Sequence, residues 1–345
     1  MKAVGYRQSL PVTDPESLVD LELPDPVPGG RDLLVQVKAV SVNPVDTKVR
    51  KRSAPPPGET KVLGYDAAGI VAGTGPEASL FQPGDEVWYA GSVARPGTNS
   101  ELHIVDERIV GKKPASLSFA EAAAMPLTTI TAWELLFDRL GVPPGKQPGG
   151  QSLLIVGAAG GVGSMLTQLA RRLTGLTVIG TASRKETTEW VFSRGAHHVI
   201  DHRQPLSVEL KRIGIPQVTN IASLTQTDSH FVEIVESLEP QGKLALIDDP
   251  SPIDVRLLKP KSLALCWESM FTRAVFQTAD MIAQHRLLNE VADLVDAGTI
   301  RTTLTQILQP INADNLRNAH ASQEAGRTIG KVVLTDWPHA DGAAA

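Results

Sequence analysis

Cysteine is almost absent from this chain, since Cys266 is the only one among 345 residues. A single cysteine can form no intrachain disulfide, and it cannot build a zinc lobe of several cysteines. The start of the chain also lacks a long apolar stretch, because it turns polar by Arg7 and Gln8. It therefore resembles neither a signal peptide nor a membrane span. These absences predict a soluble cytoplasmic protein with no membrane partner.

An excess of positive charge is also missing. The chain has 33 Lys and Arg residues against 38 Asp and Glu residues, which gives a formal net charge of -5. Proteins that follow a nucleic-acid backbone need clustered cations, so no nucleic-acid partner is expected. The 345 residues are 42% hydrophobic and 21% charged. This composition excludes disorder for most of the length and favours two domains, each with its own core.

The sequence pattern changes near Phe119. Before it, short β-like runs such as 33–37 and 67–71 alternate with Pro and Gly turns, which is typical of a β-rich, barrel-like domain. After it, strand-like and helical segments alternate, and 152–156 is continuously apolar, as expected for a strand buried on both faces. The pattern predicts an α/β protein in which a β-rich domain is combined with a doubly wound parallel-sheet domain.

The predicted domain limits follow from the same change. The β-rich domain spans residues 1–126 and is rejoined by 268–345, whereas the parallel-sheet domain spans 127–267. The last residues, 340–345, are expected to be disordered.

A glycine-rich turn connects the apolar strand to an amphipathic helix, and it reads Gly157-Ala158-Ala159-Gly160-Gly161-Val162-Gly163. Small residues let the backbone turn tightly and let a pyrophosphate approach the amides at the helix N-terminus. The turn departs from the dinucleotide-binding fingerprint by one methyl group, at its first glycine. A purely structural turn is the alternative. The predicted cofactor-binding residues are Ala158, Gly160, Gly161, Val162 and Gly163.

The second strand of this domain ends without the acidic residue that NAD-binding proteins use to hold the ribose hydroxyls. Ser183, Arg184 and Lys185 stand there instead. One hydroxyl and two cations suit the 2′-phosphate of NADPH, although exposed cations at a helix start are the alternative. The sequence therefore predicts NADPH as the cofactor.

Several motifs, in this order, resemble those of the medium-chain dehydrogenase/reductases. They are 40–46, 64–71, 83–87, the turn at 157–163 and 330–334. Within that family the chain looks most like the zinc-type alcohol-dehydrogenase-like proteins related to NADPH:quinone oxidoreductases and ζ-crystallin. The resemblance covers nearly the whole chain. It implies a GroES-like catalytic domain, a Rossmann NADP-binding domain, an active site in the cleft between them, and a homodimer or homotetramer.

Zinc-dependent members of that family carry a Gly-His-Glu segment and a cysteine ligand. This chain has Gly64-Tyr65-Asp66 and Asn43-Pro44-Val45-Asp46 at the matching positions. Because catalytic zinc takes three protein ligands, no metal site is predicted. A second cluster, His197, His198 and His202, is better explained as partly exposed residues at the entry to a strand.

Three residues are predicted to be catalytic. The resemblance implies that Asn43 directs its amide toward the substrate and the nicotinamide ribose, and that Tyr65 replaces the lost zinc-ligand histidine. A phenol with an ordinary pKa near 10 can donate to the oxygen that gains charge when hydride arrives. The alternatives are a turn residue before Pro44 for Asn43 and an aromatic wall for Tyr65. Asp46 is expected to orient backbone or solvent.

Further cofactor contacts are implied by the resemblance and by the edge of the sheet where ligands bind. For the charged residues among them, a surface role is the alternative. They are Thr128, Thr131, the backbone of Ile247 and Asp248, Lys331 and Arg273.

These observations predict an oxidoreductase that transfers hydride from NADPH to a quinone, enone or related small-molecule carbonyl without zinc. One alternative is a zinc-dependent alcohol dehydrogenase. Another is an NADPH-binding sensor or structural protein with little turnover. The loops that would select the substrate cannot be interpreted from sequence.

Overall fold

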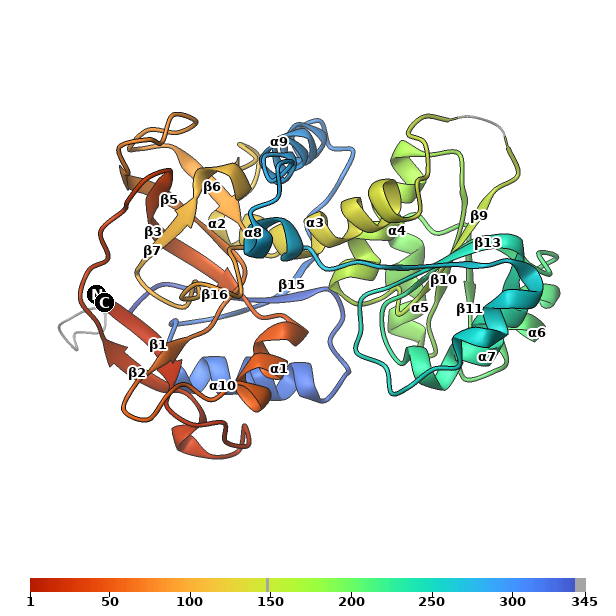
Figure 1. Ribbon diagram of the computed structural model, residues 1–345, viewed down its shortest axis with the longest axis horizontal. Coiled ribbons are helices and arrows are strands. Elements are labelled where there is room, and N and C mark those ends of the chain that lie inside the picture. Colours follow the sequence, from red (N-terminus) through yellow and green to blue (C-terminus); the bar gives the residue numbers. More distant parts are fainter. Residues whose placement is uncertain (147–148, 339–345) are drawn as a thin grey trace. The chain divides into compact units, whose positions relative to one another are not determined.

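The computed structural model describes residues 1–146 and 149–338, and the expected disorder of 340–345 lies outside them. The chain forms two compact units, coloured along the sequence in Figure 1. Unit 1 consists of Met1–Leu127 and Phe271–Ala345, and unit 2 of Thr128–Met270. The predicted domain limits at 126/127 and 267/268 stay a prediction, because compactness does not show which segments fold independently.

Unit 1 is built on β-sheets. Its larger sheet has the order β15-β16-β3-β5-β6-β8, with β7 also pairing with β3, and a smaller one has the order β2-β1-β4. The strands are β1 (Lys2–Tyr6), β2 (Val19–Glu22), β3 (Asp32–Ser41), β4 (Lys61–Val62), β5 (Ala67–Thr74), β6 (Glu86–Tyr89), β7 (Leu102–Asp106), β8 (Val110–Lys112), β15 (Leu304–Leu308) and β16 (Lys331–Thr335). Alternate residues Leu33, Val35 and Val37 of β3 are buried, as the period of a strand requires.

The C-terminal segment completes the sheet of unit 1. β16 lies between β15 and β3, pairing in parallel with the former and antiparallel with the latter. The segment after Phe271 therefore contributes two strands, β15 and β16, to the sheet of unit 1. The helices of this unit are α1 (Pro44–Arg52), α2 (Phe119–Ala123), α8 (Thr272–Phe276), α9 (Ala283–Asp296) and α10 (Ala313–Glu324), with short 3-10 turns at Pro15–Ser17 and Glu107–Ile109.

Unit 2 is a six-stranded parallel sheet with the order β11-β10-β9-β12-β13-β14. In sequence order this is 3-2-1-4-5-6, the order of dinucleotide-binding sheets. The strands are β9 (Ser152–Val156), β10 (Thr177–Thr181), β11 (His198–Ile200), β12 (Val218–Ser223), β13 (Leu238–Leu246) and β14 (Ala264–Trp267). All five residues of β9 are buried, as predicted for a strand covered on both faces, and this sheet together with the β-sheets of unit 1 confirms the predicted α/β class with a doubly wound parallel-sheet part.

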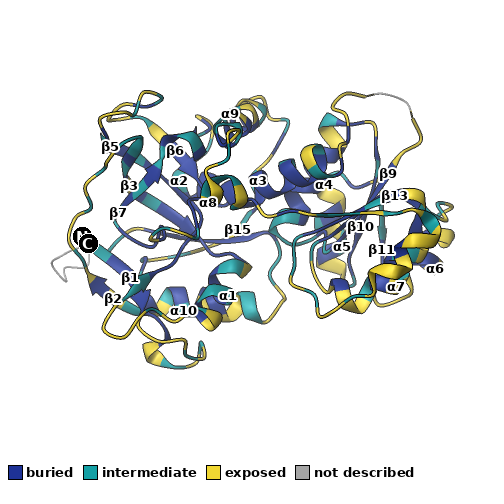
Figure 2. Ribbon diagram, in the orientation of Figure 1, coloured by how far each residue is buried: buried dark blue, intermediate teal, exposed yellow. Residues whose placement is uncertain are grey.

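The helices of unit 2 alternate with its strands. They are α4 (Gly161–Leu173), α5 (Lys185–Ser193), α6 (Leu206–Arg212), α7 (Thr227–Ser237) and the 3-10 helix η4 (Val255–Lys261), preceded by α3 (Pro126–Trp133) and the π-helix η3 (Glu134–Arg139). Figure 2 shows β9 and β10 in the middle of the sheet largely buried, while helices such as α6 and α7 have exposed surfaces. None of the helices in the described ranges is long and apolar enough to cross a membrane.

Some elements differ from the sequence-based prediction. α1 was not predicted, because the residues it buries, Asp46, Thr47 and Arg50, are polar and leave no apolar periodicity. β13 begins at Leu238 rather than Lys243, because its Pro240-Gln241-Gly242 segment has the composition of a turn.

Candidate active site

The glycine-rich turn lies between β9 and α4, where the sequence placed it. Gly157 has φ +87°, a left-handed conformation that favours glycine. Its N–H donates to Thr181 Oγ1 over 3.1 Å. A Cβ on Gly163 would lie 2.4 Å from the carbonyl oxygen of Gly157, so only glycine lets α4 start this close to the turn. The free amides at the start of this 13-residue helix form an environment suited to a phosphate.

Ala158, the departure from the fingerprint, is accommodated by a second glycine. Ala158 is completely buried, and its methyl group faces Gly180 of β10. A Cβ added to Gly180 would lie only 2.8 Å from Ala158 Cβ. The extra methyl group of Ala158 therefore occupies the space that a side chain at position 180 would need, and Gly180 leaves that space free.

The cationic segment after β10 is placed at the start of α5. Arg184 is its N-cap residue, and both Arg184 and Lys185 are exposed. Lys185 Nζ lies 3.9 Å from Glu189 Oε1, with 88% of its side chain exposed. This geometry is compatible with a 2′-phosphate contact and also with the solvated helix start, so the choice of NADPH stays a prediction.

The remaining predicted cofactor contacts have varied surroundings. Thr128 and Thr131 are buried on α3. Ile247 follows β13 directly, whereas the carboxylate of Asp248 accepts from the N–H of Thr227, over 2.9 Å, and from its hydroxyl. The Asp248 side chain thus caps α7, and only its backbone remains for the proposed contact.

Arg273 is engaged elsewhere within unit 1. Its Nη2 lies 2.9 Å from Asp280 Oδ2. The contact between Arg273 and a cofactor therefore stays a prediction, and it would compete with the ion pair to Asp280.

A buried polar network brings together residues that are far apart in sequence. Asp66 is completely buried, and its Oδ2 accepts from Ser41 Oγ at 2.8 Å, from Asn43 Nδ2 at 2.8 Å and from Lys331 Nζ at 2.9 Å. Its other oxygen accepts from the N–H of Leu127 over 2.7 Å. Lys331 Nζ also donates to Asn43 Oδ1 and to the carbonyl of Val42. Burial makes this ion pair dependent on complete hydrogen bonding.

Asp46 holds backbone near the network. Its carboxylate accepts from the N–H of Asn43 over 2.7 Å and from the N–H of Gly64 over 3.0 Å. Burial raises the pKa of Asp46 to about 7, partly opposed by these hydrogen bonds and by the charge of Lys331. Its contacts correspond to the expected role in orienting backbone rather than to contact with a reacting atom.

Tyr65 has an isolated hydroxyl group. The residue is 1% exposed, its ring packs edge-on against Phe271 at 5.4 Å, and its hydroxyl has no hydrogen-bond partner in the described part of the chain. Burial, followed by the charge of Asp46, raises the pKa of Tyr65 well above its ordinary value, so the phenol is neutral. A buried hydroxyl without a partner costs about 1–3 kcal/mol and can be satisfied by a ligand oxygen or water.

Sequence reasoning missed the role of Asp66. The signal was the acidic residue directly before the apolar run 67–71, since an unpaired carboxylate is rarely buried. Its partner could not be identified, because Lys331 lies 265 positions later. Lys331 was predicted to contact the cofactor, but its three ammonium hydrogens all have acceptors within unit 1.

Zinc does not fit the residues at this site. Asp46 and Asp66 are the carboxylates at the motif positions, and every oxygen of both already accepts a hydrogen bond from the protein. Within residues 1–146 and 149–338, no group of three His, Cys, Asp or Glu side chains could hold a metal ion. Independence from zinc itself stays a prediction.

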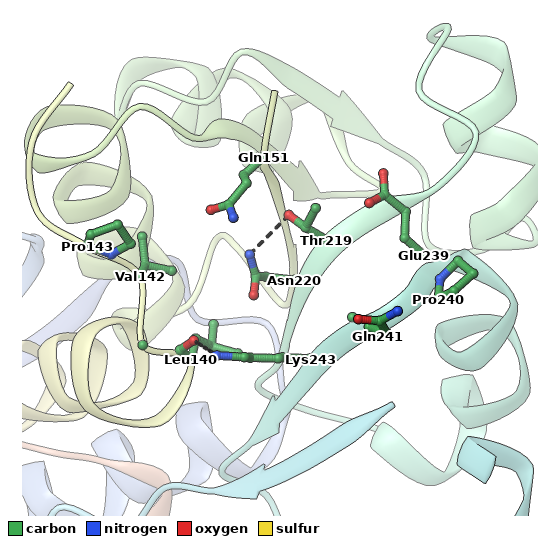
Figure 3. Close-up of a pocket in the computed structure, with 12 residues that line it drawn as sticks. Leu140, Val142, Pro143, Gln151, Thr219, Asn220, Glu239, Pro240, Gln241 and Lys243 are labelled. Carbon is green, nitrogen blue, oxygen red and sulfur yellow. Dashed lines mark hydrogen bonds between the residues drawn. The ribbon is translucent and has the colours of Figure 1, made fainter. Parts of the chain in front are cut away.

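A pocket of about 170 Å³ is lined by residues of unit 2 alone. Figure 3 shows Gln151, Thr219, Asn220 and Lys243 around it, with Asn220 Nδ2 donating to Thr219 Oγ1 over 3.1 Å. Gln151 precedes β9 and Thr219 lies near the start of β12. The pocket is therefore at the amino-terminal edge of the sheet, opposite the edge that carries the glycine-rich turn, and it contains none of the predicted site residues.

Comparison with known proteins identifies relatives for both units. Residues 29–132 match the family model of the alcohol dehydrogenase GroES-like domain, and residues 194–334 match that of zinc-binding dehydrogenases. A zinc-type alcohol dehydrogenase-like protein from Staphylococcus epidermidis is 38% identical over 338 residues, covering 97% of this chain and 99% of the relative.

Two solved structures are similar over nearly their full lengths. A Rhizobium etli protein of the zinc-dependent alcohol dehydrogenase type has a TM-score of 0.94 and 58% identity, covering 98% of this chain and 99% of that one. Escherichia coli quinone oxidoreductase, solved in complex with NADPH, has a TM-score of 0.82 and 26% identity, covering 97% and 100%.

Proposed function

Because the chain belongs to the medium-chain dehydrogenase/reductase superfamily and is an oxidoreductase of that kind, we propose that it is a zinc-independent, NADPH-dependent reductase of quinones, enones or related conjugated carbonyls. The observation that carries this proposal is the buried hydroxyl of Tyr65, which has no partner among the described residues. The hydroxyl needs a hydrogen-bond acceptor, and the carbonyl oxygen of a substrate would supply one.

The proposed chemistry requires a donor where negative charge develops. Bound NADPH would supply a hydride to an electrophilic carbon of the substrate, and the electron pair of the carbonyl π bond would move onto its oxygen. The Tyr65 hydroxyl and the Asn43 amide then donate hydrogen bonds to that oxygen. The proton that completes the reduction comes from Tyr65, which solvent reprotonates, or directly from water. The raised pKa of Tyr65 keeps the phenol in its donating form.

The cofactor assignment rests on the glycine-rich turn and on the residues after β10. Gly163 admits no Cβ, because that atom would lie 2.4 Å from the carbonyl oxygen of Gly157, so the start of α4 stays close to the turn, where its backbone amides would meet a pyrophosphate. Ser183, Arg184 and Lys185 would hold the 2′-phosphate, with no acidic side chain between Thr181 and Lys185 to repel it. The similar Escherichia coli enzyme was solved with NADPH bound, which supports the same choice here.

The test is NADPH oxidation with 1,4-benzoquinone, 9,10-phenanthrenequinone and a simple aliphatic aldehyde, using enzyme dialysed against a chelator and NADH for comparison. Quinone turnover that survives chelation and prefers NADPH is the expected result. Loss of activity that zinc restores would support the zinc-dependent alternative, whereas tight NADPH binding without turnover would support the sensor. The variant Arg184→Ala should weaken NADPH binding by about tenfold and leave NADH binding unchanged.

A further inference from the structure

The carboxamide of Asn43 is held from both ends. Its Oδ1 accepts from the ammonium of Lys331, and its Nδ2 donates to Asp66 Oδ2 over 2.8 Å. These two partners determine which end of the amide is oxygen, because a flipped amide would face NH₂ to the ammonium and oxygen to the carboxylate. The side chain of Asn43 is 1% exposed and therefore has one favourable orientation.

Among the described residues, the nitrogen-bound hydrogens of the Lys331 and Asn43 side chains in this network all have acceptors except one. Lys331 places its three hydrogens on Val42, Asn43 and Asp66, so none remains for a cofactor phosphate. Asn43 Nδ2 carries two hydrogens and makes one hydrogen bond. Its second hydrogen has no acceptor among the residues that the structure describes.

We propose that Lys331 and Asp66 are positioning residues that act through Asn43, directing its second Nδ2 hydrogen to the substrate oxygen. This inference rests on the proposed function. The positively charged ammonium of Lys331, which donates to Oδ1, draws electron density from the amide and strengthens the remaining N–H as a donor. Asp66 fixes the direction of that hydrogen by binding the other one.

A kinetic cycle tests whether Lys331 acts through Asn43. The variants are Asn43→Ala, Lys331→Met and the two combined, assayed with the best quinone found for the wild type. Lys331→Met should lower kcat by about 10²-fold with NADPH Kd unchanged, and should have no further effect in the Asn43→Ala background. A full effect of Lys331→Met in that background, or a large rise in NADPH Kd, would overturn the proposal in favour of an independent cofactor contact.

Matched controls separate positioning from folding. Lys113 is also a buried lysine of unit 1, with its Nζ 3.0 Å from Glu86, so Lys113→Met should lower Tm without changing kcat. The variant pairing Asp66→Asn with Lys331→Met removes both charges, and should regain Tm relative to Lys331→Met while kcat stays low. Recovery of kcat together with Tm would show that the ion pair is merely structural.

A readout without turnover keeps this inference separate from the proposed function. In ¹⁵N-asparagine-labelled protein, the Asn43 side-chain amide is assigned by its loss in Asn43→Ala. Lys331→Met should shift both of its hydrogen resonances, whereas Lys113→Met should leave them in place. Unchanged resonances in Lys331→Met would overturn the positioning role even if the enzyme reduces quinones. If no carbonyl is reduced but the resonances shift, only the proposed function fails.

Discussion

Tyr65 offers the sharpest prediction at the scale of single residues, because its hydroxyl is buried and has no partner among the described residues. Removing that oxygen in Tyr65→Phe should leave Tm unchanged or slightly higher, since no hydrogen bond is lost. The same change should lower kcat by about 10²-fold if the hydroxyl meets the developing charge. Thermal unfolding and steady-state kinetics on the same preparation measure both effects.

Tyr89 is a matched control for that variant. It is also completely buried, but its hydroxyl lies 3.1 Å from His103 Nδ1. Tyr89→Phe should therefore destabilise the protein by about 1–3 kcal/mol and leave kcat intact. A Tyr65→Phe enzyme that is less stable but fully active would contradict the role given to Tyr65.

Asp46 should make stability depend on pH. Its pKa of about 7 in the folded state exceeds the ordinary value near 3.9, so the folded chain retains a proton that the unfolded chain releases. The resulting stabilisation is complete below about pH 4 and is lost as pH rises through about 7. Tm of the wild type, measured relative to the non-titrating Asp46→Asn variant, should fall by several degrees between pH 5 and pH 8. A constant difference would show that Asp46 is ionised throughout.

At the scale of elements, the contact between the glycine-rich turn and β10 determines which side chains positions 158 and 180 can carry together. A methyl group on Gly180 would lie 2.6 Å from Val191 Cγ1 and 2.8 Å from Ala158 Cβ. We expect Gly180→Ala to cost about 1–3 kcal/mol and to weaken NADPH binding by displacing the turn. Combining it with Ala158→Gly should recover part of both losses. Thermal unfolding and fluorescence titration with NADPH measure them, and strictly additive effects would count against the contact.

The elements also show how far sequence reasoning reaches. β9 and the glycine-rich turn were predictable, because a buried parallel strand and a tight phosphate-binding turn each restrict the residues allowed locally. α1 was not, because Arg50 and Asp46 on its buried side find their partners elsewhere in the chain. The same holds for the site: Asn43 and Tyr65 could be identified from motifs, but the pairing of Asp66 with Lys331 depends on tertiary structure.

The edge of the sheet in unit 2 bears on the expected homodimer or homotetramer, which stays a prediction. β14 ends the strand order, and Trp267 at its end is 54% exposed. An edge strand with an exposed aromatic side chain can pair with the same strand of a second copy. Trp267→Lys should therefore lower the mass measured by light scattering. Phe192→Lys, at a 48% exposed aromatic residue on α5, is the control and should not.

The separation of Asp66 and Lys331 by 265 positions also affects how the protein is made. The ribosome adds Asp66 to the growing chain long before it adds Lys331. Lys331 belongs to β16, which is the last strand described. Until Lys331 is added, the carboxylate of Asp66 has no ammonium partner with which it can be buried, and the sheet of unit 1 lacks β16. The segment 128–270 is contiguous and can close in the meantime. A translation product that stops before β16 therefore cannot hold the Asn43 amide between Lys331 and Asp66.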